Sequence, residues 1–264
     1  MPVPSTRTVP NLDPMKLKVV IYAPPGFGKS TLLSNLPDDV LVLALDPGWS
    51  QLSGRLWQDE KGNSIITSWE QFILASGEAA KDPSVRAIAV DHVDLMVDYA
   101  AQVVCQASGA KSISDMKVLP FGDGYVRVAK MIREWLMRVV SLGKGYWLVT
   151  HPIEETIEDG PVKTTTVRPR VPESPKKGIN PYSIVLNTAD VILCGRETVV
   201  VKEDKRSLYR AWFSAWDGTT PRYVAKDRTG KLPLYFECDK ETCGAAAFLR
   251  AFQPTQPQQE TTVE

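Results

Sequence analysis

The chain has 264 residues, which is enough for one large α/β domain or two small ones. Basic and acidic residues number 31 each, so a surface that is basic all over is excluded, whereas a local basic stripe is not. Neither an apolar signal core at the N-terminus nor an apolar run of membrane-spanning length is present, so we expect a cytoplasmic protein without a membrane partner.

The chain begins with residues 1–15, which carry several prolines and no apolar period, and we expect a disordered arm there. Residues 17–22 form a short β-branched apolar run that is typical of a buried strand. A glycine-bearing loop follows at residues 23–31, and residues 32–36 have the pattern of a first helical turn. A strand, such a loop with Gly-Lys-Ser, and a helix in this order predict a phosphate-binding loop.

The residue types of this loop suit the phosphates of ATP. Gly26 and Gly28 let the backbone curl so that several N–H groups face one anion, and the start of the helix adds partial positive charge. We expect Lys29 to be exposed and to reach the β- and γ-phosphates, while the Ser30 hydroxyl binds Mg²⁺. Ala23 stands where the usual pattern has glycine, which is a mild change. The predicted ATP-binding residues are Pro25, Gly26, Phe27, Gly28, Lys29, Ser30 and Thr31.

Apolar runs then alternate with helical patterns. Buried strands are predicted at residues 40–45, 86–90 and 146–150, with a possible short strand at 64–66. Helices are predicted over residues 69–80, 93–107 and 125–142. This alternation predicts an α/β fold with a mostly parallel central sheet and helices on both faces.

Polar residues follow three of these strands. Asp46 ends the second strand, which we place in the centre of the sheet, Asp91 ends the third and His151 the fourth. Because ligands of such sheets bind beyond the carboxyl ends of the strands, these residues and the phosphate loop should converge on one site. We expect Asp91 to hold Mg²⁺ through water opposite Ser30, the alternative being a helix cap.

Hydrolysis also requires an acid that orients the attacking water. Asp46 and Asp94 are the candidates, and Asp94, one helical turn after Asp91, could instead cap its helix. His151 could contact the γ-phosphate or be a structural hydrogen-bonding residue.

Residues 153–181 are rich in Pro, Thr, Lys and Arg and have no period, which predicts a long basic loop. Such a loop beside an ATP site could follow the backbone of single-stranded DNA, or it could be a solvated loop. The predicted DNA-binding residues are Lys163, Arg168, Arg170, Lys176 and Lys177.

The last part of the chain contains further strand-like runs at residues 189–194, 198–202 and 208–213. Residues 253–264 are rich in Gln, Thr and Pro, so we expect a disordered tail after a single domain over residues 16–252. The four cysteines match neither a zinc ribbon nor a Cys-x-x-Cys pair, and we expect scattered, reduced thiols. These cysteines are Cys105, Cys194, Cys238 and Cys243.

The run 226–230, Lys-Asp-Arg-Thr-Gly, resembles the Lys-x-Arg-x-Gly segment of RecA/DnaB-type ATPases. Together with residues 23–31, Val90-Asp91, Phe121–Tyr125 and Thr150-His151, it makes residues 17–235 similar to the RecA-like ATPases of phage recombination cassettes, the Sak single-strand-annealing group. The resemblance implies a single RecA core that binds ATP, Mg²⁺ and single-stranded DNA and cooperates with a single-stranded-DNA-binding protein.

The resemblance further implies that Lys226 and Arg228 reach the ATP site of a neighbouring subunit, in a ring or filament of identical chains. RecA-like proteins commonly carry a catalytic Glu where this chain has Gly48, so turnover is expected to be slow unless Asp46 substitutes. We therefore favour an ATP-hydrolysing protein acting on single-stranded DNA in phage recombination or replication. The alternatives are a small-molecule or nucleotide kinase, with residues 163–177 as its lid, and a non-catalytic ATP-gated assembly protein.

Overall fold

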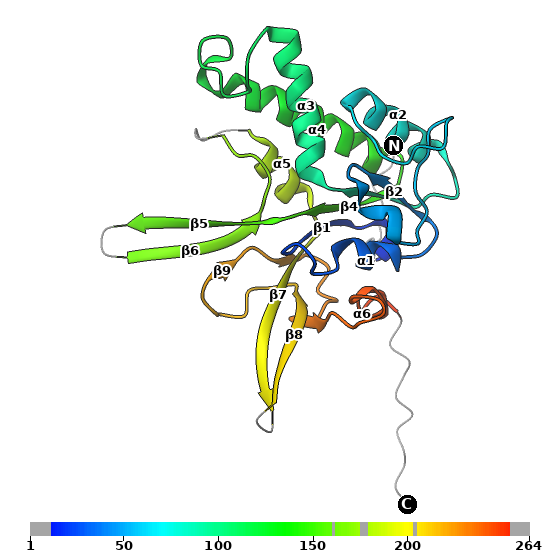
Figure 1. Cartoon of the computed structure of the whole chain (residues 1–264), viewed down its shortest axis with the longest axis vertical. Helices are drawn as coiled ribbons and strands as arrows, with labels where there is room; N and C mark the ends of the chain where they lie inside the picture. Colours follow the sequence, from blue (N-terminus) through cyan, green and yellow to red (C-terminus); the bar gives the residue numbers. More distant parts are fainter. Residues whose placement is uncertain (1–11, 160–161, 175–178, 203–204, 254–264) are drawn as a thin grey trace, which may run out of the picture.

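The computed structural model describes residues 12–159, 162–174, 179–202 and 205–253. Its centre is a sheet with a run of parallel strands (Figure 1). In spatial order these strands are β2 (Val40–Ala44), β3 (Ala87–Asp91), β4 (Gly145–Thr150), β1 (Lys18–Tyr22) and β7 (Val191–Lys202). Beyond β7 the sheet continues antiparallel through β8 (Lys205–Phe213) and β11 (Tyr235–Glu237), and β10 (Lys226–Asp227) pairs with the start of β7.

Helices cover both faces of this sheet (Figure 1). On one face lie α2 (Trp69–Lys81), α3 (Val93–Ser108), α4 (Asp123–Ser141) and α5 (Pro181–Thr188), and on the other lie α1 (Lys29–Ser34) and α6 (Ala245–Arg250). Side chains alternate along β1, so Val20 and Tyr22 pack in the core between the sheet and α2–α5. Val19 and Ile21 pack in the core between the sheet and the helices α1 and α6. Short 3₁₀ turns span Pro14–Lys16, Pro47–Gln51 and Pro120–Gly122. The predicted α/β fold is confirmed.

The predicted loop over residues 153–181 is wrong for most of its described part. Its first half is an antiparallel β-hairpin of β5 (Pro152–Asp159) and β6 (Val162–Pro169), which extends away from the rest of the molecule (Figure 1). The short strand β9 (Arg222–Tyr223) pairs with β6 in parallel. Most residues of β5 and β6 are polar, so no apolar period marks these strands, although the β-branched residues Thr164–Thr166 favour a strand.

The edges of the sheet and of the fold also differ from expectation. β2 is the outermost named strand of the parallel run, so Asp46 does not end a central strand. Beyond β2, the described residues form two single bridges, Val42 with Leu56 and Ala44 with Ile65, and the latter replaces the possible strand at 64–66. Within the predicted arm, Met15 is 1% exposed and belongs to the core. Residues 1–11 and 254–264, where we expected disorder, lie outside the described residues.

The expectation of scattered, reduced thiols is wrong for two of the cysteines. Cys238 and Cys243 form a disulfide, whereas Cys105 and Cys194 are free. The two residues meet because Asp239 stabilises the turn between them by accepting hydrogen bonds from the backbone of Glu241 and Thr242. Among the helices of the described residues, none has both the length and the apolar composition needed to cross a membrane.

Candidate functional site

The loop of residues 23–31 connects β1 to α1 at the carboxyl edge of the parallel strands. Gly26 and Gly28 have φ values of +73° and +110°, which favour glycine, and a Cβ at Gly28 would lie 2.3 Å from Cys243 Sγ. Several amides of the loop donate to no other residue in the described part of the chain: those of Gly28, Lys29, Ser30 and Thr31. Free N–H groups at the start of a helix form a cradle for an anion.

The side chain of Lys29 lies across this loop. Its Nζ donates to the carbonyl oxygens of Ala23 at 2.8 Å and Pro24 at 3.0 Å. The residue is 5% exposed, so the expectation of an exposed lysine is wrong. Burial lowers the pKa of Lys29, and the nearby charges of Asp91, Asp94 and Asp46 offset this only in part. The ammonium is thus held against the cradle, within a site that carries negative charge.

Phe27 and Pro25, which also belong to the predicted ATP-binding residues, differ in their exposure. The ring of Phe27 is fully buried and packs against Trp212 with ring centroids 4.8 Å apart. Pro25 is exposed and lines the cavity beside the loop. The loop is also held from outside by Arg210, whose guanidinium donates to the carbonyl oxygen of Gly26 at 3.2 Å. Arg210 is far away in the sequence and belongs to no motif, so sequence reasoning missed it.

Asp91 and Ser30 form the core of the site. The Ser30 hydroxyl donates to Asp91 Oδ2 at 2.6 Å, and the indole N–H of Trp49 donates to the same oxygen at 3.0 Å. Burial raises the pKa of Asp91, but hydrogen bonds from His92, Ser30 and Trp49 outweigh it and the pKa is lowered. An ionised carboxylate beside a hydroxyl is an oxygen donor set that suits Mg²⁺, so these residues fit the expected ion.

His92 bridges two carboxylates of the site. Its Nε2 lies 2.8 Å from Asp91 Oδ1 and its Nδ1 lies 3.3 Å from Asp46 Oδ2. Burial lowers the pKa of His92, but the hydrogen bond to Asp91 and the charges of Asp91, Asp46 and Asp94 raise it overall. Sequence reasoning missed this residue because a histidine at the start of a helix pattern matches no motif. Its position directly after Asp91 was the only available signal.

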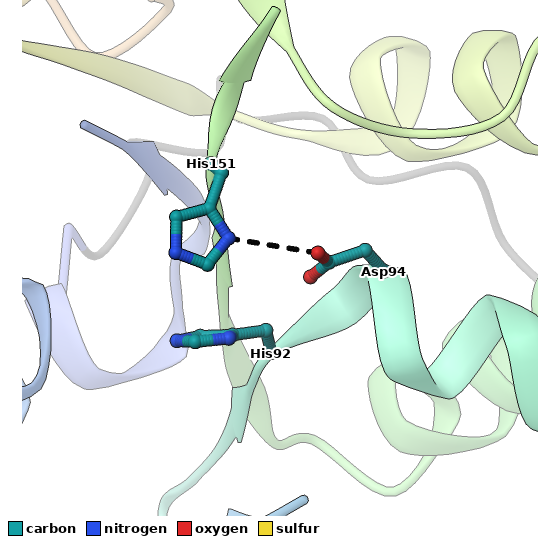
Figure 2. A group of neighbouring side chains, drawn as sticks. All are labelled: His92, Asp94 and His151. Carbon is teal, nitrogen blue, oxygen red and sulfur yellow. Dashed lines mark ion pairs between the residues drawn. The ribbon is translucent and has the colours of Figure 1, made fainter. Parts of the chain in front are cut away.

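His151 lies above His92 and beside Asp94 (Figure 2). Its Nδ1 is 3.5 Å from Asp94 Oδ2, and the two imidazole rings meet edge to face with centroids 4.5 Å apart. Burial and the charges of Lys29 and His92 lower the pKa of His151.

Ligand atoms of His92, Asp94 and His151 lie within 4.8 Å of one another, the spacing of a possible metal site. A metal must lie in the plane of an imidazole, on a nitrogen lone pair. Both nitrogens of His92 face other carboxylates, those of Asp91 and Asp46, so in the arrangement observed His92 pairs with these two groups rather than sharing a metal with Asp94 and His151.

Two cavities flank the phosphate loop. One, of about 410 Å³, is lined by loop residues together with Asp46, His92 and His151. The other, of about 480 Å³, lies between the loop and the segment 237–243. Since Asp91 contacts Ser30 directly, the structure brings the phosphate loop, Asp46, Asp91 and His151 together at one edge of the sheet.

Lys226 and Arg228 lie at the opposite edge of the sheet. β10 pairs Lys226 with Ile192 near the start of β7, whereas the phosphate loop follows the end of β1. Lys226 Nζ donates to the carbonyl oxygens of Leu186 and Ala189, at 3.0 and 2.6 Å. Arg228 is exposed, and its guanidinium donates to the carbonyl oxygen of Asn187 at 3.3 Å. Within one chain neither residue reaches the phosphate loop.

The predicted DNA-binding residues do not share one environment. Arg168 pairs with Glu155 at 2.8 Å and Glu173 at 3.1 Å, and its side chain is 12% exposed, so it does not belong to a solvated basic loop. Its guanidinium also lies 4.6 Å from the ring centre of Tyr182. Lys163 and Arg170 are exposed. Lys176 and Lys177 lie outside the described residues.

A comparison with protein families finds one match to the chain, over residues 15–229, with a family described as an AAA domain. No curated protein matches the chain. The matched span contains the phosphate loop, Asp91, His151 and Arg228, and it ends before the cysteine pair at 238 and 243 and before α6.

Proposed function

Because the chain belongs to the AAA domain family of P-loop ATPases, we propose that it binds ATP with Mg²⁺ at residues 23–31 and hydrolyses it. The observation that carries the proposal is the cradle of unbonded amides beside the Ser30–Asp91 pair. A phosphate chain would accept from these amides, and Ser30 and Asp91 would hold the ion. When bound, Mg²⁺ offsets the negative charge of the β- and γ-phosphate oxygens.

The residues around the cradle then take separate roles. Lys29 would exchange its two carbonyl acceptors for phosphate oxygens, which suits an ammonium already held against the loop. We assign the orientation of the attacking water to Asp46, which lines the cavity and is held by His92. Asp94 is the weaker candidate because it is not among the residues that line this cavity.

We further propose that the chains assemble head to tail and that Arg228 reaches the ATP of a neighbouring subunit. The exposed position of Arg228, at the edge of the sheet opposite the phosphate loop, supports this. Lys226 is less suited, since its ammonium is engaged by two carbonyl oxygens. Of the two residues expected to reach the neighbouring ATP site, we therefore retain Arg228 in the proposal.

We propose single-stranded DNA as the ligand of the assembly, and a single-stranded-DNA-binding protein as its partner in phage recombination or replication. Support comes from the resemblance and from two exposed cations near the β5–β6 hairpin, Lys163 and Arg170. The kinase alternative requires residues 163–177 to form an arginine-rich lid over an acceptor pocket. Most of the described part of this segment is strand β6, and Arg168 in it is held by two glutamates, which favours the ATPase.

The proposal is tested by measuring phosphate release from ATP with and without single-stranded DNA, beside sedimentation with and without ATP. We expect slow release that DNA accelerates and an assembly that forms with ATP. Nucleotide binding and assembly without phosphate release would favour the non-catalytic alternative. Transfer of phosphate to a small-molecule acceptor by a monomer would favour the kinase. Absence of nucleotide binding would refute the assignment of the loop.

A further inference from the structure

The disulfide-forming pair of Cys238 and Cys243 lies directly on the outer side of the phosphate loop. The Sγ atoms of Cys243 and Cys238 lie 3.4 and 3.7 Å from the carbonyl oxygen of Phe27. A Cβ at Gly28 would lie 2.3 Å from Cys243 Sγ, so sulfur and loop backbone are in contact. The contact is at the peptide that joins Phe27 to Gly28.

This peptide couples the sulfurs to the anion cradle. In a planar trans peptide the carbonyl and the N–H point in opposite directions. A group that holds the Phe27 carbonyl toward Cys238 and Cys243 therefore turns the Gly28 N–H away from the two sulfurs. That N–H is one of the amides without an acceptor in the described residues. Arg210 holds the carbonyl of Gly26 from outside in the same manner.

The oxidation state of the sulfurs decides whether they can hold this carbonyl. A thiol carries an S–H donor, whereas a disulfide has no hydrogen to donate. In the dithiol form, Cys238 and Cys243 can both donate to the Phe27 oxygen, and in the disulfide form only a van der Waals contact remains. Reduction should therefore fix the Gly28 N–H in its phosphate-facing orientation, and oxidation should release it.

The surroundings of Cys238 and Cys243 favour reversible formation and reduction of the disulfide. Cys238 is partly exposed, so a small disulfide or thiol can reach it, whereas Cys243 is 4% exposed. Asp239 accepts from the amides of Glu241, Thr242 and Gly244, and these bonds keep the turn closed without the disulfide. Burial acts to raise the pKa of Asp239, but the hydrogen bonds lower it to about 2, so the carboxylate stays ionised. The two thiols thus stay close enough to pair again.

We propose that Cys238 and Cys243 form a reversible thiol–disulfide site that regulates nucleotide binding, with the dithiol form binding more tightly. The inference rests on the proposed ATP-binding function. A small-molecule disulfide such as oxidised glutathione is the oxidant. Its S–S bond breaks, a bond between Cys238 and Cys243 forms, and two electrons and two protons pass from the cysteines to two glutathione thiols.

The experiment measures the affinity of the full chain for a fluorescent ADP analogue after reduction with dithiothreitol and after oxidation with glutathione disulfide. Mass spectrometry of peptides establishes the state of the pair in each sample. We expect the reduced protein to bind about three- to tenfold more tightly, the range that one hydrogen bond contributes. Equal affinity in two samples that differ in the disulfide overturns the inference.

Two variants separate this pair from the other thiols. Cys238→Ser cannot form the disulfide but keeps a hydroxyl donor, so its affinity should no longer respond to glutathione disulfide. Cys105→Ser, which changes a free cysteine on α3, should respond as the wild type does. A response that persists in Cys238→Ser overturns the inference. Absence of analogue binding in both redox states would instead refute the proposed nucleotide site.

Discussion

Two lysines at opposite edges of the sheet have the same kind of hydrogen-bond partner, a pair of backbone carbonyl oxygens. Lys29 donates to two carbonyl oxygens at 2.8 and 3.0 Å, and Lys226 donates to two at 3.0 and 2.6 Å. Burial lowers the pKa of both. The lysines differ in the backbone around them. Amides beside Lys29 have no acceptor in the described residues, whereas the amides of Arg228 and Thr229 donate to Asp190 and Asp227.

This difference assigns the two regions to different tasks. The carbonyls around Lys226 belong to the last turn of α5 and to its C-cap, where a helix leaves acceptors without partners, so one cation completes the helix end. At the phosphate loop the groups without partners are donors, and a cation cannot satisfy them. Only an anion can. A ligand site is therefore indicated by the open donors of the backbone rather than by its lysine.

The largest effect is expected for Lys29→Ala. Removal of the ammonium takes away a charge that faces the transferred phosphate, so ATP turnover should be abolished. The melting temperature should change little, because the lost partners are carbonyls of the loop itself. Phosphate release and thermal melts measure the two quantities. Turnover close to that of the wild type would refute the loop assignment.

The next largest effect is expected for Arg228, which lies at the edge of the sheet opposite the phosphate loop of its own chain. Arg228→Ala should lower turnover by up to about a thousandfold if the residue acts as an arginine finger. Mixing Lys29→Ala with Arg228→Ala should restore part of the activity, because some interfaces pair an intact loop with an intact arginine. If the two proteins co-assemble and the mixture stays inactive, Arg228 does not act between subunits.

A smaller effect is expected for Asp46→Asn. The variant keeps the hydrogen bond that caps the turn at Gly48 but loses the charge beside His92. Turnover should fall by about a hundredfold, the usual contribution of a positioned acid–base group, with nucleotide affinity nearly unchanged. Asp94→Asn is the matched control and should keep most of the turnover. Loss of affinity with normal turnover at saturating ATP would instead assign Asp46 to the ion or to the fold.

The features that the sequence predicts well are local ones. The strand, loop and helix around Gly28 are encoded within adjacent residues, and apolar runs mark the strands that end near Asp46, Asp91 and His151. Because parallel strands end at one edge, their meeting could be predicted as well.

The features that it predicts poorly depend on contacts between distant residues. His92 acquires Asp46 as a partner only when two strand ends meet, and the contact of Cys243 with Gly28 spans most of the chain. The β5–β6 hairpin was missed because it has little buried apolar face. For His92 and Cys243 the deciding interaction lies outside any local window of the sequence, whereas the hairpin pairs neighbouring segments that carry no apolar period.

The smallest effect is expected for Lys226→Ala, which tests most directly whether Lys226 and Lys29 have different roles. Without its ammonium, the carbonyl oxygens of Leu186 and Ala189 lose a charged donor at the end of α5. Hydrogen bonds from charged groups contribute measurably, so the free energy of unfolding should fall by about 1–2 kcal/mol. Urea unfolding measures this as a lower midpoint with an unchanged slope.

The matched control for this variant is Lys231→Ala, which changes an exposed lysine of the same region and should leave the midpoint where it is. Turnover per folded chain should stay near that of the wild type in both variants, because Lys226 serves the helix end and not the ATP. If Lys226→Ala unfolds as the wild type does while its turnover falls, the roles are reversed. Both lysines would then act at an ATP site, Lys29 at that of its own chain and Lys226 at that of a neighbouring subunit.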